Sequence, residues 1–244
     1  MARFLNRKGL LIQHIPRTGG TWVEEIICHC RVPHYRWLQV QPDYLPSKHC
    51  ALSHYNRDAM VQVKMTAAFV RHPISYYESC YKWMYFAETK LMRYRWKWHP
   101  HMAAARWFKA APVNFNDWVY LMLEKEPCWY TRLIEMYVGP PGGEFIDYIG
   151  RTESLRQDFI NLMIMVGYVG VIEKNKEFIM SAPKANTREL EIEWDHSLRD
   201  RVEKTEFLIT ERFYGENSQR RRYARLVANQ IEIVAACRRS ARKK

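Results

Sequence analysis

A short stretch near the start of the chain combines the residue types that bind anions. It runs Pro16-Arg17-Thr18-Gly19-Gly20-Thr21-Trp22 and follows a largely apolar segment, residues 10–15. This order predicts a strand, a tight turn and a helix whose first N–H groups point back at the strand end and hold an anion. The glycines allow an oxyanion to approach the main chain, and Arg17 adds a charged donor. The stretch is therefore interpreted as a phosphate- or sulfate-cradling loop, with an ordinary strand–turn–helix joint as the alternative.

Two further strand-like segments are each followed by an arginine. Residues 64–70 form an apolar run typical of a buried parallel strand, and the run stops at Arg71. Residues 145–149 predict another strand, which is followed closely by Arg151. Ligands of parallel sheets bind outside the carboxyl ends of the strands. We therefore expect Arg17, Arg71 and Arg151 to converge on one crevice that binds a polyanion.

The rest of the sequence predicts the helices and strands that would position these arginines. Helical periodicity predicts helices over residues 20–30, 73–86, 115–126, 152–166, 197–214 and 219–237. A short strand is expected at 48–54, and residues 129–138 are compatible with a helix or an irregular segment. Strands that alternate with helices predict an α/β fold with a central parallel sheet flanked by helices.

The length of 244 residues fits one sizeable domain. We expect a single α/β domain over residues 1–214, with an insertion on the acceptor side at 87–112, and a C-terminal amphipathic helix with a basic tail at 215–244. Nine basic residues and one acidic residue between Gln219 and Lys244 contribute +8 of the net charge of +12. The high pI is thus mostly a property of the tail and does not indicate that the globular body binds nucleic acid.

Several classes of protein are disfavoured by composition. The six cysteines lack the paired spacing of zinc sites, which favours reduced thiols in a cytoplasmic protein. There is no apolar run of the length that a membrane helix needs, so no membrane span is expected. No signal peptide is visible, which again favours the cytoplasm. The oligomeric state has no signature in the sequence.

Three segments resemble, in the right order, motifs of the PAPS-dependent sulfotransferases, where PAPS is 3′-phosphoadenosine 5′-phosphosulfate. The similarity is to the carbohydrate branch, which is Golgi-type and heparan-sulfate-like, and to its bacterial and viral relatives. Residues 15–21 resemble the loop that binds the 5′-phosphosulfate. Residues 69–73, with Ser79 eight positions after Arg71, resemble the segment that binds the 3′-phosphate. Residues 150–155 resemble the family's Gly-Arg-x-Glu-x-Leu segment. The likeness covers roughly residues 10–166, with a weaker match at 205–214.

This resemblance implies a P-loop-like three-layer sandwich and transfer of a sulfuryl group from PAPS to a hydroxyl acceptor, a glycan or another small molecule, without a metal. The residues implied in binding PAPS are Pro16, Arg17, Thr18, Gly19, Gly20, Thr21, Trp22, Arg71, Ser79 and Arg151. The family usually has a lysine, which contacts the leaving-group oxygen, at the position of Arg17, and the two side chains are not interchangeable.

A base must accept the proton of the acceptor hydroxyl. We assign this role to His54, which lies near the end of a predicted strand and in an interval comparable to that of the catalytic histidine of uronyl-type members. A structural role for His54 is the alternative, and a histidine pKa near 6.5 suits the catalytic one. His49 is the nearest rival, and Glu24 and Glu25 stay open because some relatives use a glutamate.

Two other functions compete with sulfuryl transfer. A P-loop-like nucleotide kinase would use ATP and magnesium, but residues 16–21 are shorter than a Walker A motif and lack its lysine. A non-enzymatic nucleic-acid-binding protein would use the basic tail and the insertion at 87–112, and it would leave the three strand-end arginines unexplained. No specific nucleic-acid partner is expected.

Overall fold

A computed structural model describes residues 3–5, 7–34, 51–52, 55, 60–87, 114–143, 145–185 and 189–215. Its sheet has the strands β1 (Arg3–Leu5), β2 (Leu10–Gln13), β3 (Met65–Val70) and β4 (Tyr148–Arg151) in the order β1-β2-β3-β4. β1 pairs antiparallel with β2, whereas β2, β3 and β4 are parallel to one another. The carboxyl ends of the three parallel strands therefore meet at one edge of the sheet, as expected from the sequence.

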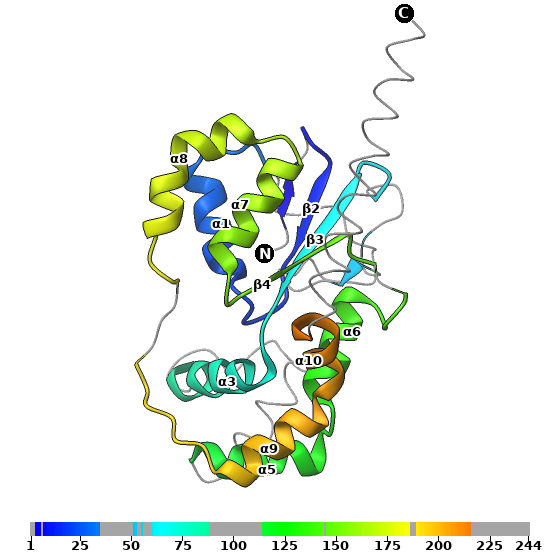
Figure 1. Ribbon diagram of the computed structural model, residues 1–244, viewed down its shortest axis with the longest axis vertical. Helices are drawn as coiled ribbons and strands as arrows, with labels where there is room; N and C mark the ends of the chain where they lie inside the picture. The colour runs from blue at the N-terminus through cyan, green and yellow to red at the C-terminus, as the bar shows by residue number, and fades with distance from the viewer. Residues whose placement is uncertain are drawn as a thin grey trace, which may run out of the picture.

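The described helices are α1 (Gly20–His29), α3 (Pro73–Ala87), α5 (Phe115–Lys125), α6 (Trp129–Val138), α7 (Leu155–Met165), α8 (Val169–Ser181), α9 (His196–Thr205) and α10 (Phe207–Tyr214). Figure 1 shows α1, α7 and α8 grouped together on the sheet, and α3, α5, α6, α9 and α10 in a second group. The fold is an α/β fold with an open, mostly parallel sheet. The arrangement is compatible with a three-layer sandwich.

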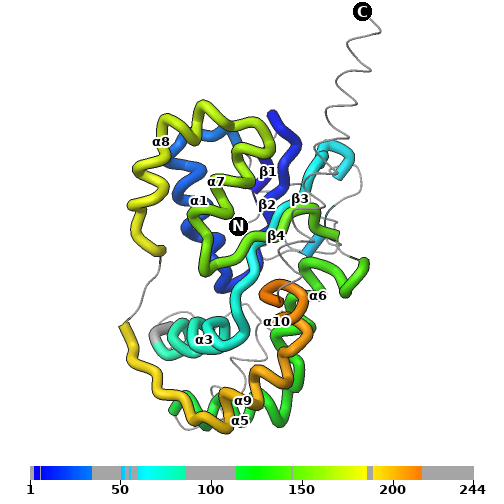
Figure 2. The backbone as a smooth tube through the Cα atoms, in the orientation of Figure 1, coloured from blue at the N-terminus to red at the C-terminus, as the bar shows by residue number. Residues whose placement is uncertain are grey.

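Alternate residues of β3 belong to the two hydrophobic cores. Ala67 and Phe69 pack with α1, α7 and α8, whereas Ala68 and Val70 pack with the second group of helices. Side chains of successive strand residues point to opposite faces, so a strand covered on both faces must be apolar throughout. This explains why residues 67–70 are continuously apolar rather than alternating. Figure 2 follows the chain from β3 almost directly into α3.

The N-terminus of α6 is stabilised by a buried carboxylate from a distant part of the chain. Glu206, between α9 and α10, has no exposed surface, and its carboxylate accepts hydrogen bonds from the N–H groups of Tyr130 (3.1 Å) and Thr131 (2.8 Å). It also accepts the hydroxyls of Thr131 (2.6 Å) and Tyr77 (3.0 Å). The N-cap residue of α6, Cys128, makes no side-chain capping bond, so Glu206 takes that role.

Several details differ from the sequence-based expectations. The single helix expected at 197–214 is divided into α9 and α10 at Glu206, whose side chain serves α6. Residues 129–138, left open between helix and irregular segment, form the regular helix α6. The three-residue edge strand β1 was not predicted, since so short a strand has no measurable periodicity. Most of the strand expected at 48–54, the insertion at 87–112 and nearly all of 215–244 lie outside the described residues.

Among the helices that the structure describes, none is long and apolar enough to cross a membrane.

Candidate functional site

The loop between β2 and α1 has the geometry of an anion cradle. Two of its residues adopt left-handed backbone conformations, Arg17 (φ 64°) and Gly19 (φ 87°). Gly19 is the N-cap of α1 and brings no side chain to cap the helix, so the first N–H groups of α1 meet no capping side chain. The Thr18 hydroxyl instead donates to the carbonyl of Ile15 at 2.9 Å and closes the turn. Main-chain N–H groups in such a turn form a concave site for an anion.

Both glycines of the loop also lie close to neighbouring side chains. A Cβ atom on Gly20 would lie 2.5 Å from Nδ1 of His14, and one on Gly19 would lie 2.6 Å from Cδ2 of Leu155. His14 is only 6% exposed, so its ring has little room to move. The glycines therefore allow the loop to lie close to His14 and to α7.

We expect Gly20→Ala to lower the free energy of unfolding by about 1–3 kcal/mol, because the new methyl group overlaps the His14 ring. Gly170→Ala is the matched control. Gly170 lies in α8 with no atom within 4 Å of an added Cβ, so this substitution should instead stabilise the protein by about 0.5–1 kcal/mol. Urea denaturation of both variants measures the difference. Equal stability of the two variants would contradict the close approach of Gly20 to His14.

Arg17 connects this loop to the end of β3. Its Nε donates to Oγ of Ser79 at 3.1 Å, and its carbonyl accepts a hydrogen bond from Nη1 of Arg71 at 3.0 Å. Nε of Arg71 donates to Oγ of Ser75 at 3.3 Å. Ser75 and Ser79 are one helical turn apart on the same face of α3. Two segments separated by more than fifty residues thus form one cluster of guanidinium and hydroxyl groups.

The hydrogen bonds within this cluster bring in one residue beyond those expected from the sequence. The assignment of Arg71 and Ser79 to the same phosphate stays a prediction; in the structure Arg71 donates to Ser75, and Arg17 donates to Ser79. Ser75 was not among the residues selected from the sequence. It could have been found from its spacing, since it lies four residues after Arg71 and four before Ser79.

The third arginine lies at the end of β4, beside the other two. Arg151 is the register partner of Val70, the last residue of β3. Its N–H donates to the carboxylate of Asp158 at 2.7 Å, and its guanidinium lies 5.0 Å from the centroid of the Tyr214 ring. This cation–π contact brings the end of α10 to the sheet edge. The expected convergence of Arg17, Arg71 and Arg151 on one edge is thus present in the fold.

Glu153 holds the ends of β3 and β4 together. Oε1 accepts the N–H of His72 (2.9 Å) and the hydroxyl of Ser75 (3.1 Å), and Oε2 accepts the hydroxyl of Tyr214 (2.7 Å). Burial, assisted by the Glu153 charge, raises the pKa of Tyr214 far above its ordinary value, so this hydroxyl remains a donor. Burial lowers the pKa of His72, although Glu153 opposes the shift. Neutral His72 leaves the positive charge of the site to the arginines.

The other residues selected from the sequence contribute mainly through their backbones. Trp22 is buried with its ring against Phe159 (centroids 5.8 Å apart, planes at 86°), so only its main chain belongs to the loop. Pro16 has no N–H to offer and is buried at the start of the turn. Thr21 is half-buried in the first turn of α1. The loop and first turn, residues 16–22, together with Arg71, Ser75, Ser79 and Arg151, are called the anion site below.

The candidates for the catalytic base are only partly described. His54 and His49 lie outside the described residues. Glu24, on α1, forms an ion pair with the buried Arg3 of β1, so part of its charge is already neutralised. Glu25 is exposed on the neighbouring face of α1. His54 therefore stays a prediction.

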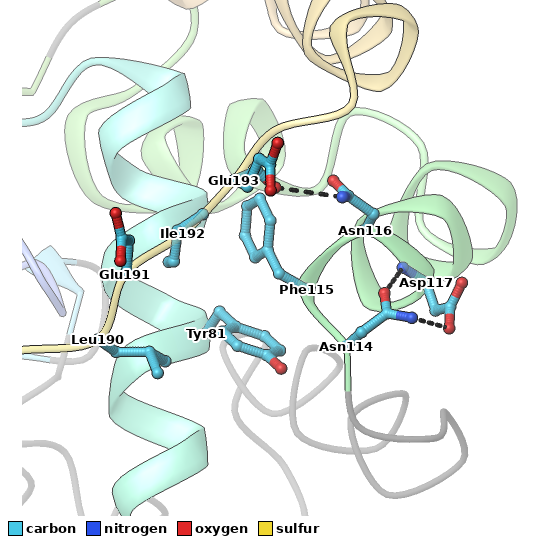
Figure 3. Close-up of a pocket in the computed structure, with 9 residues that line it drawn as sticks. All are labelled: Tyr81, Asn114, Phe115, Asn116, Asp117, Leu190, Glu191, Ile192 and Glu193. Carbon is cyan, nitrogen blue, oxygen red and sulfur yellow. Dashed lines mark hydrogen bonds between the residues drawn. The ribbon is translucent and has the colours of Figure 1, made fainter.

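A separate hollow of about 400 Å³ lies between α3, α5 and the extended segment 190–193. Figure 3 shows Tyr81, Phe115, Asn114 and Asn116 among the residues that line it. The charged residues that line the hollow are all acidic: Asp117, Glu191 and Glu193. These carboxylates repel phosphate and sulfate, so this hollow differs in chemistry from the anion site although both use α3.

In the part of the chain that the structure describes, no three His, Cys, Asp or Glu side chains are grouped closely enough to hold a metal ion.

No protein-family model, no curated protein and no solved structure significantly matches this chain. The functional interpretation therefore depends on the geometry of the anion site and on the three sequence motifs.

Proposed function

We propose that this protein is a PAPS-dependent sulfotransferase that transfers the sulfuryl group to a hydroxyl acceptor by in-line displacement. The observation that carries the proposal is the contact of Arg17 with Ser79 and Arg71. These contacts join the loop at the N-terminus of α1 to the segment at the end of β3. PAPS is an elongated ligand with anionic groups at two separate positions, and a site with two joined anion-binding segments suits it.

The donor would use the anion site in two parts. The N–H groups of Gly19, Gly20 and Thr21 would hold the 5′-phosphosulfate, since they lie at the positive end of α1. Arg71, with the hydroxyls of Ser75 and Ser79, would hold the 3′-phosphate through charge-assisted hydrogen bonds. Arg151 would add positive charge at the adjacent strand end. These roles do not depend on whether the fold is P-loop-like. We propose that it is, and the parallel sheet and the loop before α1 support this assignment.

Sulfuryl transfer resembles phosphoryl transfer, in which positioning and charge stabilisation supply most of the catalysis. The acceptor oxygen bonds to sulfur while the bond from sulfur to the phosphate oxygen breaks. Negative charge then develops on the departing phosphate oxygen, where Arg17 and the loop N–H groups would stabilise it. The acceptor proton passes to a base, for which we propose His54. Arg17 replaces the lysine that is usual in the family while keeping the positive charge.

We further propose a carbohydrate acceptor, which the likeness of residues 150–155 to the carbohydrate branch supports. A panel of glycans and small alcohols incubated with sulfate-labelled PAPS would identify the acceptor by transfer of the label. Label transfer to a sugar hydroxyl is the expected result, and transfer only to non-carbohydrate alcohols would contradict this part of the proposal.

The function is tested by the thermal stability of the protein with different ligands. We expect 3′,5′-adenosine bisphosphate, without magnesium, to stabilise the folded protein by about 2.7 kcal/mol when its concentration is a hundred times its Kd. Stabilisation only by ATP with magnesium would instead indicate a nucleotide kinase. A salt-sensitive response to an oligonucleotide alone would indicate a nucleic-acid-binding protein. Either of these last results would overturn the sulfotransferase proposal.

A further inference from the structure

The hydroxyl of Tyr130 makes hydrogen bonds with both backbone polar groups of Arg71. It donates to the Arg71 carbonyl at 2.7 Å and accepts the Arg71 N–H at 3.1 Å. Arg71 is the first residue after β3, where the regular ladder of the sheet has ended. Both of its backbone polar groups are thus satisfied by one side chain from α6, a helix that no sequence motif of the anion site includes.

Tyr130 is itself held rigidly. Its side chain has no exposed surface, and its ring stacks on that of Tyr76 with centroids 3.9 Å apart and planes at 21°. Its N–H is bound by the buried carboxylate of Glu206. Tyr76 belongs to α3, so the ring also spans from α6 to the helix that carries Ser75 and Ser79. A side chain with this many fixed contacts has one accessible rotamer.

We infer that Tyr130 is a positioning residue for the anion site, which it serves by fixing the backbone from which the Arg71 guanidinium extends. The inference deepens the proposed function and rests on it for the identity of the ligand. Without the two hydrogen bonds, the peptide units on either side of Arg71 can rotate, and the guanidinium loses its alignment with Ser75 and the Arg17 carbonyl. A guanidinium that samples many orientations binds an anion less tightly because binding must then restrict it.

The hydroxyl of Tyr130 is protonated at neutral pH, as this role requires. Burial raises the pKa of Tyr130 well above its ordinary value, and the hydrogen bond with the Arg71 backbone only partly offsets this effect. The group therefore keeps the proton with which it donates to the Arg71 carbonyl.

The test compares Tyr130→Phe with Tyr148→Phe. Tyr148 is buried, and its hydroxyl donates to the backbone carbonyl of Asp158 at 2.7 Å, the same bond type and length as in Tyr130. It belongs to the core with α1, α7 and α8, on the other face of the sheet from Tyr130. Tyr148→Phe should lower the melting temperature by about 2–4 °C, and Tyr130→Phe, which loses two hydrogen bonds, by about 4–8 °C. Only Tyr130→Phe should weaken the binding of 3′,5′-adenosine bisphosphate, by about tenfold, and reduce the preference for this ligand over 5′-AMP.

Each outcome has a distinct meaning. Equal preference for the bisphosphate in Tyr130→Phe and the unmodified protein would overturn the positioning role and leave the proposed function intact. If the unmodified protein shows no preference for the bisphosphate over 5′-AMP, the proposed function is overturned. Titration with inorganic pyrophosphate then decides whether Tyr130 positions Arg71 for anion binding. Weaker pyrophosphate binding in Tyr130→Phe alone supports it, whereas equal binding in all three proteins, or none in any, overturns it. All titrations are made below the lowest melting temperature.

Discussion

Arg71→Ala is expected to weaken the binding of 3′,5′-adenosine bisphosphate by about 10–100-fold. Hydrogen bonds to a charged partner contribute about 1.5–3 kcal/mol, and each 1.4 kcal/mol corresponds to a factor of ten in Kd. Arg71 already uses Nε for Ser75 and Nη1 for the Arg17 carbonyl. Both contacts orient the guanidinium, and no described residue contacts Nη2. The substitution therefore removes a charge that is held in place rather than a mobile one.

A loss of binding that is confined to the ligand with a 3′-phosphate distinguishes the assigned role of Arg71 from a general effect of its positive charge. Binding of 5′-AMP, which lacks the 3′-phosphate, should change by less than about threefold in the same variant, since Arg71 is assigned to that phosphate. Arg132→Ala is the control for charge alone. This arginine lies on α6, is 55% exposed and pairs with Glu126 at 2.8 Å. Calorimetric titration of both ligands measures the change, and equal losses for the two nucleotides in Arg71→Ala would refute the assignment.

Glu206→Ala is expected to lower the free energy of unfolding by about 3–5 kcal/mol, the largest stability effect that we predict. The substitution leaves two N–H groups and two hydroxyls without their buried acceptor, and each unsatisfied group costs about 1–3 kcal/mol, in part relieved by water that enters the space. The negative charge at the N-terminus of α6 is lost as well. Since domains of this size are stable by about 5–15 kcal/mol, the expected loss is a large fraction of the total stability.

The matched control is Glu124→Ala, which removes another glutamate and leaves its partner, Arg201, without that ion pair. Glu124 pairs with Arg201 at 2.7 Å, but both side chains are more than 40% exposed, so the expected change is about 0–1 kcal/mol. Glu206→Gln keeps one acceptor oxygen and should fall between the two. Guanidinium chloride denaturation followed by circular dichroism gives the three values. A Glu206→Ala protein as stable as Glu124→Ala would show that this carboxylate is not needed to hold α6.

The parts of the anion site that could be predicted from the sequence are those with a local signal. The apolar run that forms β3 and the glycines before α1 are each contained in a few consecutive residues. Strand–helix alternation then places Arg17, Arg71 and Arg151 at one edge, because the carboxyl ends of parallel strands share it. The predicted convergence needed no knowledge of individual contacts, only of strand direction.

The partners of these arginines could not be predicted, because they depend on packing between distant segments. Tyr130 contacts Arg71 across 59 residues, and Tyr214 contacts Glu153 across 61. Tyr130 lies in no motif, and Tyr214 lies only in the weaker match at residues 205–214. The hydrogen bond of Arg71 to Ser75 likewise depends on how α3 packs. Glu206 illustrates the same limit. A glutamate in a helical pattern is normally a surface residue, and only the position of α6 shows that it is buried.

The parallel order of β2, β3 and β4 has a consequence for how the protein folds. At the carboxyl ends of β3 and β4, Val70 pairs with Arg151, and the Thr152 hydroxyl donates to the Val70 carbonyl across 82 residues, so the sheet edge that carries the arginines is built from contacts between distant parts of the chain. Such contacts form late and slowly, because long loops must close before the pairing stabilises them. During synthesis, a chain that has not reached residue 148 holds Arg17 and Arg71 but lacks the strand that positions the third arginine. Full affinity for the anion should therefore require the pairing of β4 with β3, so ligand binding reports on this late step of folding.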